Sequence, residues 1–185
     1  MASLNLENSD ALDVLKISIL RIQSIALIHE KLYHYNNLSR IQLKNYDPEL
    51  LNTIIKTTNL DTDIGLQIDI DDVMINLNQT IPLALFINEV VSNAIKHAFN
   101  GLGNGTIKIV LSYHHDILKL MISDNGNGIT DEQDMSSVKS LGMQLIHTLA
   151  KQLNADLSIE NANGTKVTLH FECINKKGIV SSLNT

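Results

Sequence analysis

The chain has 185 residues, of which 44% are hydrophobic, and it carries a formal net charge of −6 at pH 7. That length and apolar content are enough for one compact domain with a further segment attached. The basic residues are scattered, aromatic residues are few and tryptophan is absent, so composition and charge argue against a nucleic-acid-binding protein.

Neither a membrane span nor a disulfide is expected in this chain. The longest uninterrupted apolar run, residues 81–87, is far shorter than the roughly 20 residues that cross a bilayer, and the first residues lack the basic-then-apolar pattern of a signal peptide. Cys173 is the single cysteine, which excludes an internal disulfide and suits a reducing compartment. We therefore expect a cytoplasmic protein with no membrane contact from this segment.

A long helix is predicted over residues 9–36. This stretch has no proline or glycine, its apolar residues recur in steps of three and four, and Ser9 or Asp10 can serve as the N-cap. Its apolar face has the spacing of the seam in a helix pair, so burying that face requires a partner helix. After a polar link, a shorter helix is predicted over residues 47–59, where "DP" supplies a cap and a proline in the first helical position.

Two strands and a third helix are predicted next. Residues 64–78 alternate apolar and polar positions around the pair Asp71-Asp72, which predicts two short strands. A helix is then predicted from about Thr80 to Asn100, where the sequence "NGLGNG" ends it.

The last part of the chain predicts two pairs of strands with a helix between them. The first pair is joined near residues 114–116, and its second strand stops at the glycines of "DNGNGI". After the polar residues 131–140, "LGMQLIHTLAKQL" predicts a helix, and "ADLSIENANGTKVTLHFEC" predicts a hairpin turning at Asn163-Gly164. The tail, residues 175–185, is predicted to be flexible. This order predicts an α+β fold, a two-layer α/β sandwich with helices on one face of a mostly antiparallel sheet.

Polar side chains form a stripe on the otherwise apolar helix that contains "NEVVSNAIKHAF". Glu89, Asn93, Lys96 and Asn100 share one face, because steps of four, seven and eleven return to the same side of a helix. A solvated stripe would explain the charged residues by themselves. Asn93 favours a binding site instead, because asparagine is a poor mid-helix residue and its amide oxygen suits Mg²⁺. A magnesium site with a lysine nearby suggests a nucleoside triphosphate.

A second candidate site lies in "MISDNGNGI", where a strand ends at Asp124 and is followed by Gly126 and Gly128. A hairpin turn at Asn125-Gly126 is the structural alternative. A calcium-binding loop is excluded, because its twelfth position would be Met135 in place of glutamate. In the functional interpretation, Asp124 accepts a hydrogen bond from an exocyclic amine while the glycines let a flat ring lie against the backbone.

Two further positions are weak signals by themselves. Gly142 begins a helix, where free backbone amides and the positive end of the dipole favour phosphate, although a simple helix-entry glycine explains it equally well. Thr165 follows the hairpin glycine directly and is also explained by an ordinary strand.

Taken in chain order, these motifs resemble the GHKL superfamily of ATP-binding domains, which groups gyrases, Hsp-type chaperones, histidine kinases and mismatch-repair ATPases. The resemblance covers roughly residues 40–173: "NEVVSNAIKHAF" is similar to the N box, "DNGNGI" to the first glycine box, "SLGMQL" to the second, and "NGTKVTLHF" to the final strand. It implies a Bergerat-type ATP-binding fold, with ATP and Mg²⁺ as cofactors.

The same resemblance assigns roles to individual residues. Asn93 would hold Mg²⁺, and Glu89 would occupy the place of a polarising carboxylate. Lys96 and His97 would face the phosphates, and Asp124 would pair with the adenine amino group. The remaining residues of the implied pocket are Gly126, Gly128, Leu141, Gly142 and Thr165.

The upstream helix narrows the resemblance to sensor histidine kinases. "RIQSIALIHEKLY" is similar to the second helix of their dimerisation segment, and "SLNLE" to the end of the first. The domains implied are a partial dimerisation segment at 1–37, an ATP-binding catalytic domain at 38–174 and the tail at 175–185. The implied partners are a second copy of the chain, bound through the N-terminal helix, and the receiver domain of a response regulator.

The phosphoacceptor histidine implied by this resemblance would lie upstream of "SLNLE". His29 is better explained as a packed residue, because it lies on the apolar seam, and "HEKLY" has Tyr33 where a zinc protease needs its second histidine. Two departures from the family pattern bear on how phosphate is enclosed. Ser140 replaces the first glycine of the second glycine box, and the lid segment between Ile129 and Ser140 is short and has no phenylalanine.

Two alternatives stay open at this point. An anti-sigma-factor serine kinase shares the pocket motifs but does not need the long N-terminal helix. A non-catalytic interaction module would keep the fold with a degenerate pocket.

Overall fold

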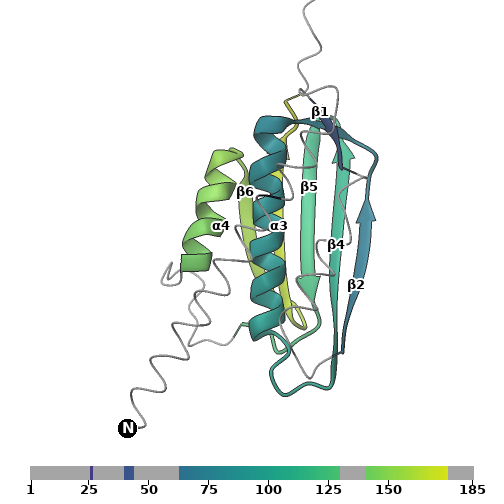
Figure 1. Ribbon diagram of the computed structural model, residues 1–185, viewed down its shortest axis with the longest axis vertical. Coiled ribbons are helices and arrows are strands. Elements are labelled where there is room, and N and C mark those ends of the chain that lie inside the picture. The colour runs from purple at the N-terminus through teal and green to yellow at the C-terminus, as the bar shows by residue number, and fades with distance from the viewer. Residues whose placement is uncertain (1–25, 27–39, 44–62, 130–140, 175–185) are drawn as a thin grey trace, which may run out of the picture.

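The computed structural model describes residue 26 and residues 40–43, 63–129 and 141–174 (Figure 1). Apart from Ala26, which is helical, the helices predicted over 9–36 and 47–59 lie outside the described residues. The same holds for the polar segment at 131–140 and for the tail from residue 175.

Within the described residues, five strands form the main sheet. In spatial order they are β2 (Asp63–Ile70), β4 (Asn104–His114), β5 (Ile117–Asp124), β7 (Thr165–Glu172) and β6 (Asp156–Asn161). Strand β2 runs parallel to β4, and every other neighbouring pair is antiparallel. A parallel pair needs a long crossover, and here the crossover contains a helix. The mostly antiparallel sheet predicted from the sequence is therefore confirmed.

Two helices, α3 (Leu77–His97) and α4 (Leu141–Gln152), pack side by side over one face of this sheet (Figure 1). Strands β4 and β5 alternate buried and more exposed residues, so one face of each lies against the helices. The most deeply buried large side chains come from both layers: Ile75, Leu83, Phe86, Ile95, Phe99, Ile107, Ile109, Leu111, Leu118, Leu120 and Ile122. The predicted two-layer sandwich is confirmed.

The two short strands predicted around the aspartate pair exist, but they belong to different sheets. Strand β3 (Met74–Asn76) pairs with β1 (Arg40–Gln42) in a separate two-stranded antiparallel sheet. Because β3 leads directly into α3, this small sheet joins the chain around residue 40 to the start of the long helix.

Helix α3 is shifted toward the N-terminus relative to its predicted bounds. It begins at Leu77, because the Asn76 side chain caps it by accepting a hydrogen bond from the Gln79 amide at 2.9 Å. It ends at His97, with Ala98 as the C-cap. Asn100 therefore lies in the following turn, and its predicted place on the polar face of the helix is wrong.

Gln79 joins the start of α3 to the end of β7. Its side chain is buried; Nε2 donates to the carbonyl of Glu172 at 2.7 Å, and Oε1 accepts from the amide of Ile174 at 3.1 Å. A buried side chain that satisfies two backbone groups is costly to lose, because those groups then lack their partners.

Replacing this side chain is expected to destabilise the fold. Gln79→Leu has a side chain of similar size but removes both of these hydrogen bonds and the one that Oε1 accepts from Nδ2 of Asn76 at 3.3 Å, so we expect a loss of about 1–3 kcal/mol in the free energy of unfolding. Urea denaturation measures it, with Gln152→Leu, an exposed position at the end of α4, as the matched control. Equal unfolding midpoints for the two variants would contradict the role given to Gln79.

Candidate functional site

The polar side of α3 meets the start of α4 at Gly142. A Cβ atom at Gly142 would overlap Oε1 of Glu89 and would lie 3.4 Å from both Oδ1 and Nδ2 of Asn93. Only a residue without a side chain permits this approach. The structure thus brings Glu89 and Asn93 of the predicted polar stripe against Gly142, which lies about fifty positions further along the chain.

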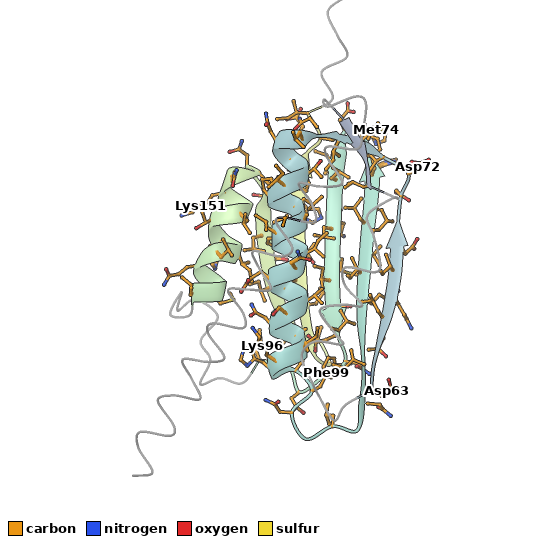
Figure 2. All side chains as sticks on the ribbon, viewed as in Figure 1. Asp63, Asp72, Met74, Lys96, Phe99 and Lys151 are labelled. Atoms are coloured by element: carbon orange, nitrogen blue, oxygen red, sulfur yellow. The ribbon has the colours of Figure 1, made fainter. Side chains whose placement is uncertain are left out.

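Glu89 is buried, with only 4% of its surface exposed, while Asn93 and Lys96 are partly buried. Charged side chains are rarely buried unless they have a specific role or partner. The simple interpretation of a solvated stripe therefore does not hold for Glu89. His97, in the last turn, is partly covered but keeps a large exposed fraction, and Figure 2 shows the neighbouring Lys96 at the C-terminal end of the helix.

The carboxylate of Asp124 is held in a fixed orientation at the end of β5. Asp124 is 8% exposed, and its Oδ1 accepts from the amide of Gly126 at 3.0 Å and from the amide of Thr165 at 3.1 Å. Within the described part of the chain, Oδ2 has no hydrogen-bond donor against it. An ionised carboxylate accepts through both oxygens, so Oδ2 retains capacity for a donor from a ligand.

Two glycines let the chain come close to Asp124. A Cβ atom at Gly126 would overlap the carbonyl of Ala98 at the end of α3, and one at Gly164 would overlap the carbonyl of Asp124 itself. Gly164 also has a φ of +121°, which residues with side chains rarely adopt. The end of β5, the end of α3 and the β6–β7 hairpin therefore converge at Asp124.

The alternative of a hairpin turn at Asn125-Gly126 is wrong. Asn125 continues the contact with β4, because its amide donates to the carbonyl of Thr106 at 3.2 Å and its Oδ1 accepts from the Thr106 amide at 2.6 Å. The next described element after β5 is α4, on the helical layer, and no strand folds back at these glycines within the described residues.

The predicted site residues fall into two groups, both next to the C-terminal half of α3 or its C-cap. One group is Glu89, Asn93 and Gly142; the other surrounds Asp124. The link is Ala98, whose carbonyl accepts from the Asn127 amide at 2.7 Å. The other predicted positions are placed as follows: Gly128 lies in the loop after Asp124, Leu141 is 64% exposed at the first position of α4, and Thr165 contributes its backbone amide.

Sequence reasoning missed the asparagines that hold the loop after Asp124. Asn127 donates through Nδ2 to the carbonyl of Asn100 at 3.0 Å, and Asn161 donates through Nδ2 to the carbonyl of Ile129 at 2.8 Å. Asparagine readily bonds to the backbone of turns, so the density of asparagine in "DNGNGI" and "ENANGT" was the available signal. The partners of these side chains are far away in sequence and leave no local pattern.

His97 is expected to make stability depend on pH. Partial burial, followed by the charge of Lys96, lowers the pKa of His97 from its ordinary value of 6.5. Between the folded pKa and 6.5 the unfolded chain binds more protons, so stability rises with pH through this window and falls on acidification.

A variant without this histidine is expected to lose part of that dependence. His97→Gln should narrow the difference in unfolding temperature between pH 5 and pH 7.5, chiefly by raising the value at pH 5. Thermal denaturation at both pH values measures it, and His114→Gln, an exposed position at the end of β4, is the control. The same pH dependence in wild type and His97→Gln would refute the expectation.

Comparison with known families identifies the class of protein that this fold and site define. The model of the histidine kinase-, DNA gyrase B-, and HSP90-like ATPases matches residues 78–174, more than half of the chain, and the chain belongs to this family. A second model, described as histidine kinase, matches residues 1–58. The predicted GHKL resemblance is confirmed, and the chain combines an ATPase domain of this family with a preceding segment that matches a histidine-kinase model.

Individual relatives include a histidine kinase and a serine kinase. The sensor histidine kinase PdtaS of Mycobacterium tuberculosis is 28% identical over 170 residues, which cover 88% of this chain and 33% of PdtaS. The chain therefore spans about a third of the length of this relative. The serine-protein kinase RsbW of Listeria monocytogenes is 28% identical over 81 residues, covering 36% of this chain and 52% of RsbW.

The solved structures show the same fold. The histidine kinase domain of the blue-light-activated histidine kinase EL346 from Erythrobacter litoralis superposes with a TM-score of 0.74 at 21% identity, covering 83% of this chain and 73% of that one.

Among the described residues, no helix combines the length and the apolar character needed to cross a bilayer.

Proposed function

We propose that this chain is the ATP-binding catalytic part of a sensor histidine kinase, which moves the γ-phosphoryl group of ATP to a histidine of the dimerisation segment. The observation that carries the proposal is the close contact of Gly142 with Glu89 and Asn93. It sets the amide-rich start of α4 against a carboxylate and an amide oxygen, a combination that suits a triphosphate and its metal ion.

The adenine end of the nucleotide is assigned to Asp124. With Oδ1 already bonded to two backbone amides, Oδ2 is the acceptor available to an exocyclic amine. Gly126 and Gly128 let the adjacent loop pack closely against the carbonyl of Ala98 and the side chain of Asn161, and the purine is expected to lie beside this loop.

The residues at the phosphate end have the chemistry that Mg²⁺ requires. Mg²⁺ takes oxygen ligands and in nucleotide sites is usually bound by one or two protein groups, with phosphate oxygens and water completing the set. Asn93 would hold the ion through its amide oxygen. The positive charge of the ion would offset the negative charge of the triphosphate. Lys96 and His97 are assigned to the phosphates, and Glu89 to the polarisation of the attacking group.

In this reaction the protein acts mainly by positioning and by electrostatic stabilisation. The γ-phosphoryl group passes in line from the leaving oxygen of ADP to a nitrogen of the accepting histidine, and little covalent chemistry is asked of the protein. Leu141, Gly142 and Thr165 would contribute to the shape of the pocket. The phosphoryl group is then proposed to pass to an aspartate in the receiver domain of a response regulator.

The organisation of the chain follows from the same proposal. Residues 1–37 belong to a dimerisation segment, residues 38–174 form the catalytic domain and residues 175–185 form a tail. The protein is proposed to be a homodimer through the N-terminal segment, with this part in the cytoplasm. The histidine-kinase match over residues 1–58 supports this assignment over the serine-kinase alternative, whose relative RsbW aligns with only 36% of the chain.

Calorimetric titration with Mg²⁺-ATP tests the proposal. The chain is expected to bind the nucleotide, and the full-length protein is expected to form an acid-labile, base-stable phosphoryl bond, as phosphohistidine does. No binding at millimolar nucleotide would favour a non-catalytic interaction module, and an acid-stable product would favour a serine kinase.

Asn93→Ala is expected to remove the contribution of Mg²⁺ to ATP affinity. Wild type should bind ATP more tightly with Mg²⁺ than with EDTA, and the variant should show about the same affinity in both conditions, because the amide oxygen that holds the ion is gone. Asn78→Ala, at an exposed position in the first turn of the same helix, is the control and should behave as wild type. A full magnesium effect in Asn93→Ala would exclude Asn93 as the ligand.

A further inference from the structure

Asn161, the last residue of β6, reaches across to the loop that follows Asp124. Its Nδ2 donates to the carbonyl of Ile129 at 2.8 Å. Its Oδ1 lies so close to Gly128 that a Cβ atom there would overlap it. The carboxamide therefore fills the space that the missing side chain of Gly128 leaves and bonds to the next residue.

The loop of residues 125–129 is fastened on three sides. Asn125 bonds to Thr106 on β4. Asn127 bonds through its amide to Ala98, the C-cap of α3, and through its side chain to Asn100 in the following turn. The third side is the β6–β7 hairpin, where Asn161 provides the hydrogen bond to the loop itself.

The conformation held in this way is one that favours glycine. Gly128 has a φ of +70°, in the left-handed region. A glycine there has access to many backbone conformations, so its geometry must be imposed by its surroundings. Asn161 is the side chain that contacts this glycine and also bonds its successor, so it restricts both residues.

We propose that Asn161 is a positioning residue of the nucleotide site, which keeps the glycine loop in the conformation that receives the purine. This inference rests on the proposed function, since the loop follows the carboxylate assigned to adenine. Asn161 acts through the loop backbone and does not itself need to touch the nucleotide. Loss of one hydrogen bond of ordinary net strength predicts a nucleotide affinity about fivefold weaker.

The first test uses the ligand-free chain. In hydrogen–deuterium exchange, Asn161→Ala should increase exchange in peptides that contain residues 125–129, while Asn78→Ala should leave those peptides unchanged. Asn161→Asp retains the size but removes the donor, so it should act in the same direction as Asn161→Ala. Unchanged exchange in both Asn161 variants would show that the Asn161 side chain does not restrict residues 125–129, whatever the protein binds.

The second test measures binding of a fluorescent ADP analogue and uses a double-mutant cycle. Gly128→Ala should weaken binding in wild type, because its Cβ overlaps the Asn161 carboxamide and because φ is positive. In an Asn161→Ala background the overlap is relieved. Gly128→Ala should therefore reduce the binding affinity less in this background than it does in wild type. Additive losses would show that the Asn161 carboxamide does not restrict Gly128.

The outcomes separate this inference from the proposed function. Weaker analogue binding with faster loop exchange and a non-additive cycle supports the positioning role. Faster loop exchange with unchanged affinity, or additive losses, overturns it while leaving the nucleotide site intact. Failure of wild type to bind the analogue at all rejects the proposed function and the positioning role with it. The exchange experiment still decides whether Asn161 restricts residues 125–129.

Discussion

Asp124→Asn is expected to weaken ATP binding about a hundredfold while leaving the fold intact. In the variant the remaining carbonyl oxygen can keep the two hydrogen bonds from the amides of Gly126 and Thr165. The new NH₂ group then takes the place of Oδ2 and faces the adenine amine, so two donors oppose each other. A buried donor–donor contact, together with the loss of a charge-assisted bond, is worth about 3 kcal/mol, which corresponds to the hundredfold loss expected.

Titration calorimetry with Mg²⁺-ATP measures this loss, and thermal denaturation checks the fold. Asp156→Asn, an exposed carboxylate at the start of β6, is the matched control and should bind as wild type. GTP provides a second comparison. The O6 atom of guanine accepts hydrogen bonds, so the ratio of ATP to GTP affinity should fall in Asp124→Asn. Undiminished ATP affinity would remove Asp124 from the site.

Gly142→Ala is expected to weaken nucleotide binding at least tenfold with little gain in stability. Alanine ordinarily stabilises a helix by about 1 kcal/mol relative to glycine. Here its methyl group would overlap Oε1 of Glu89, and because Glu89 is only 4% exposed, its side chain has little room to move. Either Glu89 or the start of α4 must shift, and both belong to the proposed phosphate end.

The control for this variant is Gly103→Ala, since a Cβ atom there would meet nothing within 4 Å. Denaturation of both variants separates stability from binding. Gly142→Ala with wild-type affinity for Mg²⁺-ATP would contradict the proposal that the contact between α3 and α4 shapes the pocket.

Local sequence patterns were sufficient for most of the elements. The alternating residues of β4 and β5, the helical spacing of α4 and the turn at Asn163-Gly164 each appear where they were predicted, because their signals lie within a few neighbouring residues. The bounds of α3 were less certain from sequence, because Asn76 is recognised as a cap only once its contact with Gln79 is known. Strand β2 has the same alternation whichever strand it pairs with, so its parallel partner was not predictable.

The sequence by itself determined which chemical groups are available: an amide and a carboxylate one turn apart on a helix, a carboxylate before two glycines, and a glycine at the start of the next helix. Only the tertiary structure decided that Glu89 is buried, that Gly142 lies against it and that Asn161 holds the loop after Asp124. The physical reason is the sequence distance between the residues that interact. Periodicity reports on neighbours along the chain, whereas these contacts join residues that meet only when two helices and a hairpin pack onto one sheet.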